Sequence, residues 1–170
     1  MWSGQSNQRS DSKSNMYRAE LLSRSYRVFL LDDLEQYEDR ISLLSDRIEQ
    51  GESTSAAFNN RGLAYSEIGQ IDEALQDFEK ATQVDPSNPY PHINKADLFK
   101  RIGRLAEAVE SCSAAIAVKK DVTFLRTRAH LLIDIGRLKE ALSDLDEAVN
   151  LEPGHTYTLQ KREEIRQQLA

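Results

Sequence analysis

The chain has 170 residues, of which 29% are charged and 39% are hydrophobic, with 7 glycines and 4 prolines. This composition excludes collagen-like and low-complexity chains and leaves enough apolar residues to form a packed core. The 28 acidic residues outnumber the 22 lysines and arginines, and the net charge of −6 argues against a protein built to bind nucleic acid. The single cysteine excludes an internal disulfide and any zinc site built on several thiolates.

The chain begins with a serine-rich, almost entirely polar stretch. Because such a stretch buries too little apolar surface to offset its ordering entropy, we expect residues 1–16 to form a disordered tail. The longest apolar run, residues 28–31, is far shorter than the roughly 20 residues that a membrane-spanning helix needs. There is also no secretory signal of the usual form. We therefore expect a cytoplasmic protein without a membrane span.

Residues 17–50 are predicted to form one long helix or two shorter helices. Apolar residues recur here at alternating spacings of four and three, which is a heptad-like pattern: Leu30, Leu34, Tyr37, Ile41, Leu44 and Ile48. Residues 51–55, Gly-Glu-Ser-Thr-Ser, then break the helix. Two roles are open for this region. It covers the exposed end of the helices that follow, as a cap or a degenerate half-repeat, or it joins two copies of the chain in a homodimer.

An internal repeat dominates the remainder of the chain. The sequence Gly-Gln-Ile-Asp-Glu-Ala-Leu at 69–75 returns in modified form at 103–109 and again at 136–142, at offsets of 34 and 33 residues. Self-similarity at such a period indicates stacked supersecondary units. Residues of similar size recur in register around this segment: Gly62, Ala96 and Ala129; Ala74, Ala108 and Ala141; Ala81, Ala115 and Ala148; Tyr65, Phe99 and Leu132; Phe78, Cys112 and Leu145.

Each unit contains two stretches of about 14 residues with apolar positions three and four apart, which predicts a pair of helices. Gly69, Gly103 and Gly136 lie between the two stretches, where a left-handed C-cap favours a residue without a Cβ. The recurring small residues allow close helix packing beside the bulky ones. Pro86 and Pro153 end the first and third units. Because one hairpin cannot bury its own apolar face, neighbouring hairpins must stack.

Residues 55–155 resemble three tetratricopeptide repeats. The second and third units depart from the family pattern conservatively. The first unit carries every position of the pattern: Phe58, Gly62, Tyr65, Gly69, Ala74, Phe78, Ala81 and Pro86. The resemblance implies an all-α fold, an α-α superhelix of three helical hairpins with an N-terminal helical region and a C-terminal capping helix. The expected organisation is as follows: repeats at 55–88, 89–121 and 122–155, and the capping helix at 156–170.

The resemblance further implies that the first helix of each repeat lines a concave, peptide-binding groove. The groove residues carried over by position are Asn59, Asn60, Leu63, Tyr90, Ile93, Asn94, Asp97, Arg101, Thr123, Arg126, Thr127, His130, Tyr157 and Lys161. Asparagine amides can both donate to and accept from a peptide backbone. Tyrosines offer a large contact area with a polar tip. We therefore expect these residues to hold an extended peptide or a partner segment.

Some members of the family bind the C-terminal carboxylate of heat-shock chaperones through a clamp of Lys, Asn, Asn, Lys and Arg. At the corresponding positions this chain has Asn59, Leu63, Asn94, Thr123 and Thr127, so only Asn94 matches. A co-chaperone of that type is therefore not expected. A secretion-type chaperone shares only the gross architecture, and it stays an alternative without a diagnostic motif.

No catalytic, cofactor-binding or metal-binding motif is present in the sequence. The three histidines are scattered, and Cys112 takes the place of Phe78, so we expect it to be a buried apolar residue. We expect a non-catalytic adaptor without cofactor or metal.

A cation recurs in the first helix of every unit, but the second unit lacks both the arginine and the aspartate of the others. This covariation predicts two ion pairs, Arg61–Asp77 and Arg128–Asp144, rather than a track for a polyanion.

Overall fold

The computed structural model describes residues 34–170. The predicted tail at 1–16 and residues 17–33 of the predicted N-terminal helical region lie outside the described residues. The described part contains a helix over residues 34–49 followed by seven helices, and no strand between residues 34 and 170. These are α2 (Ser55–Glu67), α3 (Ile71–Val84), α4 (Tyr90–Arg101), α5 (Leu105–Val118), α6 (Val122–Asp134), α7 (Leu138–Leu151) and α8 (Thr156–Leu169).

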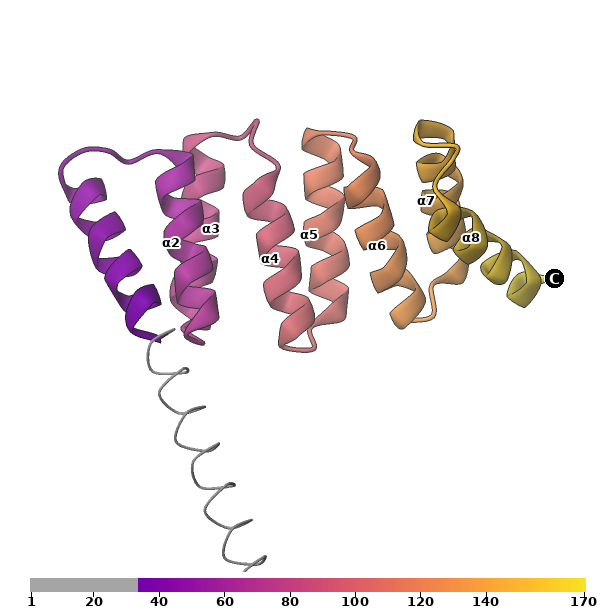
Figure 1. Ribbon diagram of the computed structural model, residues 1–170, viewed down its shortest axis with the longest axis horizontal. Coiled ribbons are helices and arrows are strands. Elements are labelled where there is room, and N and C mark those ends of the chain that lie inside the picture. Colours follow the sequence, from indigo (N-terminus) through magenta and orange to yellow (C-terminus); the bar gives the residue numbers. More distant parts are fainter. Residues whose placement is uncertain (1–33) are drawn as a thin grey trace, which may run out of the picture.

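The helices stack in chain order along one axis, each against the helix before it (Figure 1). They form the hairpins α2–α3, α4–α5 and α6–α7, with the helix over 34–49 at one end and α8 at the other. Contacts also join α2 directly to α4, so the first helices of neighbouring hairpins adjoin. The predicted all-α superhelix of three hairpins is confirmed.

The turns inside the hairpins depend on the three predicted glycines. Gly69, Gly103 and Gly136 have φ values of 78°, 78° and 76°, in the region that L-residues avoid. The amide after each glycine donates to a carbonyl five residues back, as Gln70 does to Tyr65 at 2.9 Å. This is the Schellman motif, which satisfies carbonyls that the helix end leaves free. The same closing turn therefore sets the geometry of each hairpin.

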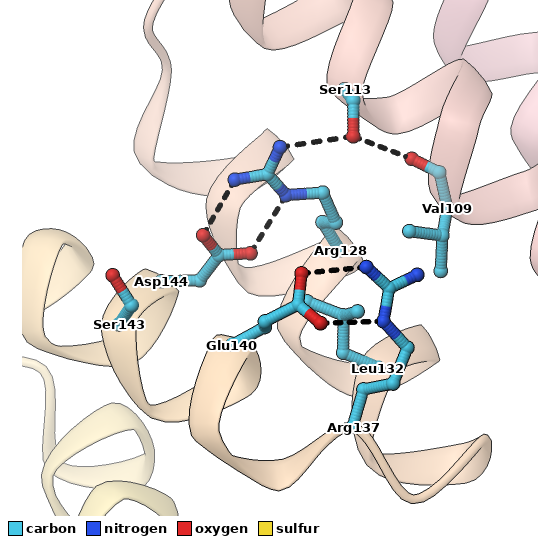
Figure 2. Close-up of a pocket in the computed structure, with 8 residues that line it drawn as sticks. All are labelled: Val109, Ser113, Arg128, Leu132, Arg137, Glu140, Ser143 and Asp144. Atoms are coloured by element: carbon cyan, nitrogen blue, oxygen red, sulfur yellow. Dashed lines mark hydrogen bonds and ion pairs between the residues drawn. The ribbon is translucent and has the colours of Figure 1, made fainter.

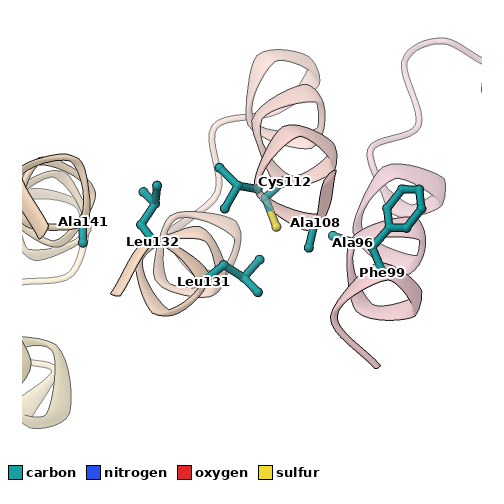
Figure 3. Packing of buried hydrophobic residues seen from close by; sticks show 8 residues of the cluster. Ala96, Phe99, Ala108, Cys112, Leu131, Leu132 and Ala141 are labelled. Carbon is teal, nitrogen blue, oxygen red and sulfur yellow. The ribbon is translucent and has the colours of Figure 1, made fainter. Parts of the chain in front are cut away.

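Complementary side-chain volumes hold the two helices of a hairpin together. In the first hairpin Gly62 faces Phe78, and a Cβ built on Gly62 would lie only 2.9 Å from the Phe78 ring and 3.1 Å from the Ala74 carbonyl. In the second and third hairpins the small residue is alanine, and its partner is smaller than the phenylalanine of the first hairpin. Ala96 shares a core cluster with Cys112 (Figure 3), and Ala129 shares one with Leu145. Cys112 is fully buried, as predicted, and burial raises the pKa of its thiol to about 11.

We expect Gly62→Ala to lower the free energy of unfolding by about 1 kcal/mol, because the overpacking cost of about 1–3 kcal/mol exceeds the gain in helix propensity. Chemical denaturation measures the change. The control is the double variant Gly62→Ala with Phe78→Leu, which copies the Ala129–Leu145 pair and should recover most of the loss. A single variant more stable than the parent would contradict the packing argument.

The two predicted ion pairs are confirmed. Arg61 donates to both carboxylate oxygens of Asp77 at 2.7 and 2.9 Å. Arg128 does the same to Asp144 at 2.8 and 2.6 Å (Figure 2). The aspartate side chains are only 3% and 5% exposed, so these are buried, bidentate bridges between the two helices of one hairpin.

The same arginines also contact the helix that precedes their own hairpin. Arg128 donates to Ser113 of α5 at 3.0 Å, and Arg61 donates to Ser45, in the helix over 34–49, at 3.0 Å. Ser45 and Ser113 occupy the same repeat position two units apart, so the helix over 34–49 contacts α2 in the way that α5 contacts α6. Lys95 of the second repeat instead pairs with Glu79 of α3, at 3.2 Å, and its ammonium lies 5.8 Å from the centroid of the Phe99 ring.

Candidate functional site

The predicted groove residues of the first two repeats meet along α2 and α4. Asn94 donates its amide to Asn59 at 2.7 Å, and Arg101 pairs with Glu67 at 2.6 Å. Arg101 also donates to the carbonyl oxygen of Ser66 at 3.2 Å. These bonds tie the first helices of neighbouring repeats together along one continuous face, which we call the inner face. It is formed by the first helices α2, α4 and α6 together with α8.

The inner face continues across α6 to α8. His130 and Tyr157 share a hydrogen bond of 2.7 Å between Nε2 and the hydroxyl, and their rings stack with centroids 5.5 Å apart. Arg126 donates to Thr158 at 2.8 Å and pairs with Glu152. Most of the predicted polar groups are therefore already engaged within the protein.

The predicted residues differ in their availability to a ligand. Leu63 and Ile93 are partly buried against core clusters, Asn59 is buried, and Thr127 donates its hydroxyl to the Thr123 carbonyl at 2.9 Å. By contrast, Tyr90 and Tyr157 are 58% and 48% exposed. Tyr90 is steadied by an edge contact with Phe124, whose ring centroid lies 6.3 Å away. The exposed members of the predicted set whose side chains form no hydrogen bond or ion pair between residues 34 and 170 are Asn60, Tyr90, Asp97 and Thr123, and Tyr157 is exposed beside His130.

The cations of the predicted groove set are all neutralised. Arg101 and Arg126 pair with glutamates, and Lys161 pairs with Glu164 at 2.6 Å. The hydrogen bond that Lys161 donates to Glu164 raises the pKa of Lys161. Asp97 lies exposed in the middle of α4 and forms no ion pair with any residue between 34 and 170. The inner face thus lacks a free cation among the predicted residues, whereas it presents a free carboxylate.

The positions of the chaperone-binding clamp carry no positive charge. The two asparagines among them, Asn59 and Asn94, are joined by one hydrogen bond, and the remaining positions are a leucine and two threonines. A carboxylate placed there would find no charged donor, although such donors make the strongest hydrogen bonds to it. That this chain does not bind a chaperone carboxylate in this way stays a prediction.

Several contributors to the inner face were not predicted from the sequence, namely Glu67, Phe124, Glu152 and Thr158. A signal existed for Glu67, because it lies 34 residues before Arg101 at the same repeat position. Opposite charges at one position of consecutive repeats indicate a pair between adjacent first helices. Between residues 34 and 170, no helix is long and apolar enough to cross a membrane, and no group of acidic, histidine or cysteine side chains is arranged to hold a metal ion.

Comparisons with known proteins agree with this architecture. The profile of the ETO1 C-terminal domain family matches residues 22–169. ETO1-like protein 2 of Arabidopsis thaliana is 33% identical over 133 residues, which make up 78% of this chain but only 14% of that protein. The chain therefore corresponds to a small part of that relative.

Solved structures of other proteins share this helical architecture. The first tetratricopeptide-repeat domain of Spaghetti (RPAP3), solved bound to the HSP90 peptide SRMEEVD, matches with a TM-score of 0.59 and 26% identity, covering 68% of this chain and 92% of that domain. The crystal structure of MamA matches with a TM-score of 0.66 over 77% of each chain, at 14% identity, which is a similarity of fold alone.

Proposed function

Because this chain belongs to the ETO1 C-terminal domain family and is an array of tetratricopeptide repeats, we propose that it is a non-catalytic adaptor that holds an extended segment of a partner protein on its inner face. The observation that carries the proposal is the continuity of that face, on which side-chain bonds join α2 to α4 and α6 to α8. A ligand laid across it meets a surface that is already ordered, so binding costs little conformational entropy. The related domain of Spaghetti was solved with a peptide bound, which supports the same use here.

The exposed groups suggest how the segment is held. Asn60 offers an amide that pairs with a peptide backbone, and the rings of Tyr90 and Tyr157 offer apolar contact area. Asp97 is the charged group available to the segment, so a neutral or basic sequence fits better than an acidic one. The anchors therefore lie in the middle of the array rather than at a carboxylate clamp.

The test begins by identifying the segment. A photo-crosslinking residue placed at position 97, compared with one at Gln76 on the exposed side of α3, captures partners from native lysate, and mass spectrometry locates the joined segment. Titration calorimetry with that segment then compares the parent with Asn60→Ala combined with Tyr90→Ala. We expect at least about tenfold weaker binding, as for loss of interface anchors, with an unchanged circular dichroism spectrum. Equal binding by the folded double variant would refute the inner-face proposal, and Gln76→Ala serves as the matched control.

We further propose that residues 34–49 cap the array rather than join two copies. Leu44 is only 8% exposed, and Ser45 accepts a hydrogen bond from Arg61 of α2. Both residues lie 34 positions before their counterparts Phe78 and Glu79 in α3, which supports a half-repeat in this place. Self-association through residues 17–50 is the competing proposal, and a dimer mass in light scattering of the full chain would favour it.

A further inference from the structure

The second repeat differs from its neighbours on the side opposite the inner face. At three positions that face the second helices, the first and third repeats agree in chemistry and the second departs. The apolar Phe58 and Leu125 correspond to His92, the arginines of the buried bridges correspond to Lys95, and their aspartates correspond to Ser111. Because Ser111 is short and donates its hydroxyl back to the Glu107 carbonyl at 2.9 Å, it does not replace the missing carboxylate.

The missing bridge leaves a larger space. In the third repeat the cavity beside Arg128 and Asp144 measures about 180 Å³ (Figure 2). The corresponding cavity of the second repeat measures about 340 Å³ and lies between α4 and α5. Lys95 does not fill it, since its ammonium contacts Glu79 on α3 instead. A second cavity of about 350 Å³ adjoins it between α3 and α4, and His92 and Lys95 line both.

We call these two cavities together the outer cleft. Its exposed apolar lining is Pro86, on the α3 side of His92, whereas the Phe78 and Phe99 rings behind it are only 1% and 5% exposed. Its carboxylates outnumber its cations: Glu79, Glu107 and Glu110 against Lys95.

The polar groups of the outer cleft are not equally engaged. Glu79 pairs with Lys95, and Glu107 pairs with Arg104, whereas Glu110 and His92 form no hydrogen bond or ion pair between residues 34 and 170. Burial, assisted by the charge of Lys95, lowers the pKa of His92, so its ring is neutral at pH 7 and does not repel a cation. Glu110 is therefore the free charged acceptor of the outer cleft.

We propose that the outer cleft is a docking site for a basic segment of a partner protein, in which an arginine binds Glu110 and an adjacent apolar side chain packs against Pro86. An arginine suits this site because its guanidinium matches a carboxylate and its aliphatic stem lies along apolar surface. The site is independent of the inner face. His92 and Lys95 face the second helices, whereas Asn94, between them in sequence, bonds across to α2. One array thus offers two surfaces to two segments.

The repeat suggests a variant that is expected to fill the part of the outer cleft between α4 and α5, where an arginine would bind Glu110. Lys95→Arg with Ser111→Asp rebuilds the bridge of the first and third repeats in the second. The probe is the capped tetrapeptide acetyl-Gly-Leu-Arg-Gly-amide, followed by amide chemical shifts of the full chain at low ionic strength. In the parent we expect shifts concentrated at His92 and Glu110. In the rebuilt variant we expect at least a fivefold loss of affinity together with a higher melting temperature.

Three comparisons make the result specific. Glu110→Gln should lose affinity at least fivefold, and Lys139→Ala on the exposed surface of α7, away from both cavities, should leave the affinity unchanged. The Leu-Glu version of the peptide should bind at least fivefold more weakly than the Leu-Arg version. Equal affinity of the parent and the rebuilt variant, or of the two peptides, would overturn the proposal. Shifts at His92 and Glu110 on concentrating the protein without peptide would also overturn it, because a second copy of the chain would then be the occupant.

Discussion

Replacing Asp144 with alanine is expected to lower the free energy of unfolding by about 3 kcal/mol, because it leaves Arg128 partly buried without its counter-charge. The Asp144 carboxylate is 5% exposed and accepts both bonds of the Arg128 fork. Ser113, the other partner of Arg128, is neutral and compensates little of the loss. Urea denaturation followed by circular dichroism measures the change.

The second repeat provides the matched control for this prediction. Ser111→Ala removes the side chain at the equivalent position where no ion pair exists, so we expect a loss below about 1 kcal/mol, as for one ordinary hydrogen bond. Arg128→Met combined with Asp144→Leu should cost less than Asp144→Ala alone, since no charge is then stranded. A loss from Asp144→Ala no greater than that from Ser111→Ala would mean that water solvates Arg128 adequately.

Adding two cations to the inner face is expected to create affinity for the HSP90 peptide SRMEEVD. Thr123→Lys with Thr127→Arg restores two clamp positions on α6, where the parent has neutral side chains. Two charge-assisted hydrogen bonds, each contributing about 1.5 kcal/mol, should tighten binding by roughly 100-fold over the parent. Titration calorimetry or fluorescence anisotropy with the labelled peptide measures the gain.

The control for this gain is Thr123→Ala with Thr127→Ala, which changes the same positions without charge and should bind as weakly as the parent. High salt should reverse most of the gain, because the added contacts are ionic. If the parent itself bound SRMEEVD as tightly as the doubly charged variant, the absence of a clamp would not matter and the argument from groove charge would be wrong.

The repeat, its turns and the two buried ion pairs were predictable from the sequence. Gly69, Gly103 and Gly136 predict left-handed turns because a residue without a Cβ adopts the positive φ that such a turn requires. The Arg61–Asp77 pair was predictable because the second repeat lost both partners together. These features depend on contacts within one hairpin, and the repeat shows the glycine turn three times and the ion pair twice.

Which side chains of the inner face are free to contact a ligand was not predictable from the sequence. Asn59 and Asn94 are equally plausible ligand-binding residues in the sequence, yet they bond to each other, while Asn60 one residue away stays exposed. The outcome depends on how far each hairpin rotates against the next, which decides whether α4 side chains reach α2. No local pattern encodes that rotation, since it results from the packing of many side chains between hairpins.

The linear order of residues was thus enough to specify the all-α array and the paired charges, because helix periodicity and turn chemistry are local and recur. Only the assembled array decided that Arg101 and Arg126 are neutralised and that the outer cleft opens at the second repeat. Both outcomes arise where neighbouring helices meet: their distance and rotation determine whether a charge finds a partner and whether a short side chain leaves a space.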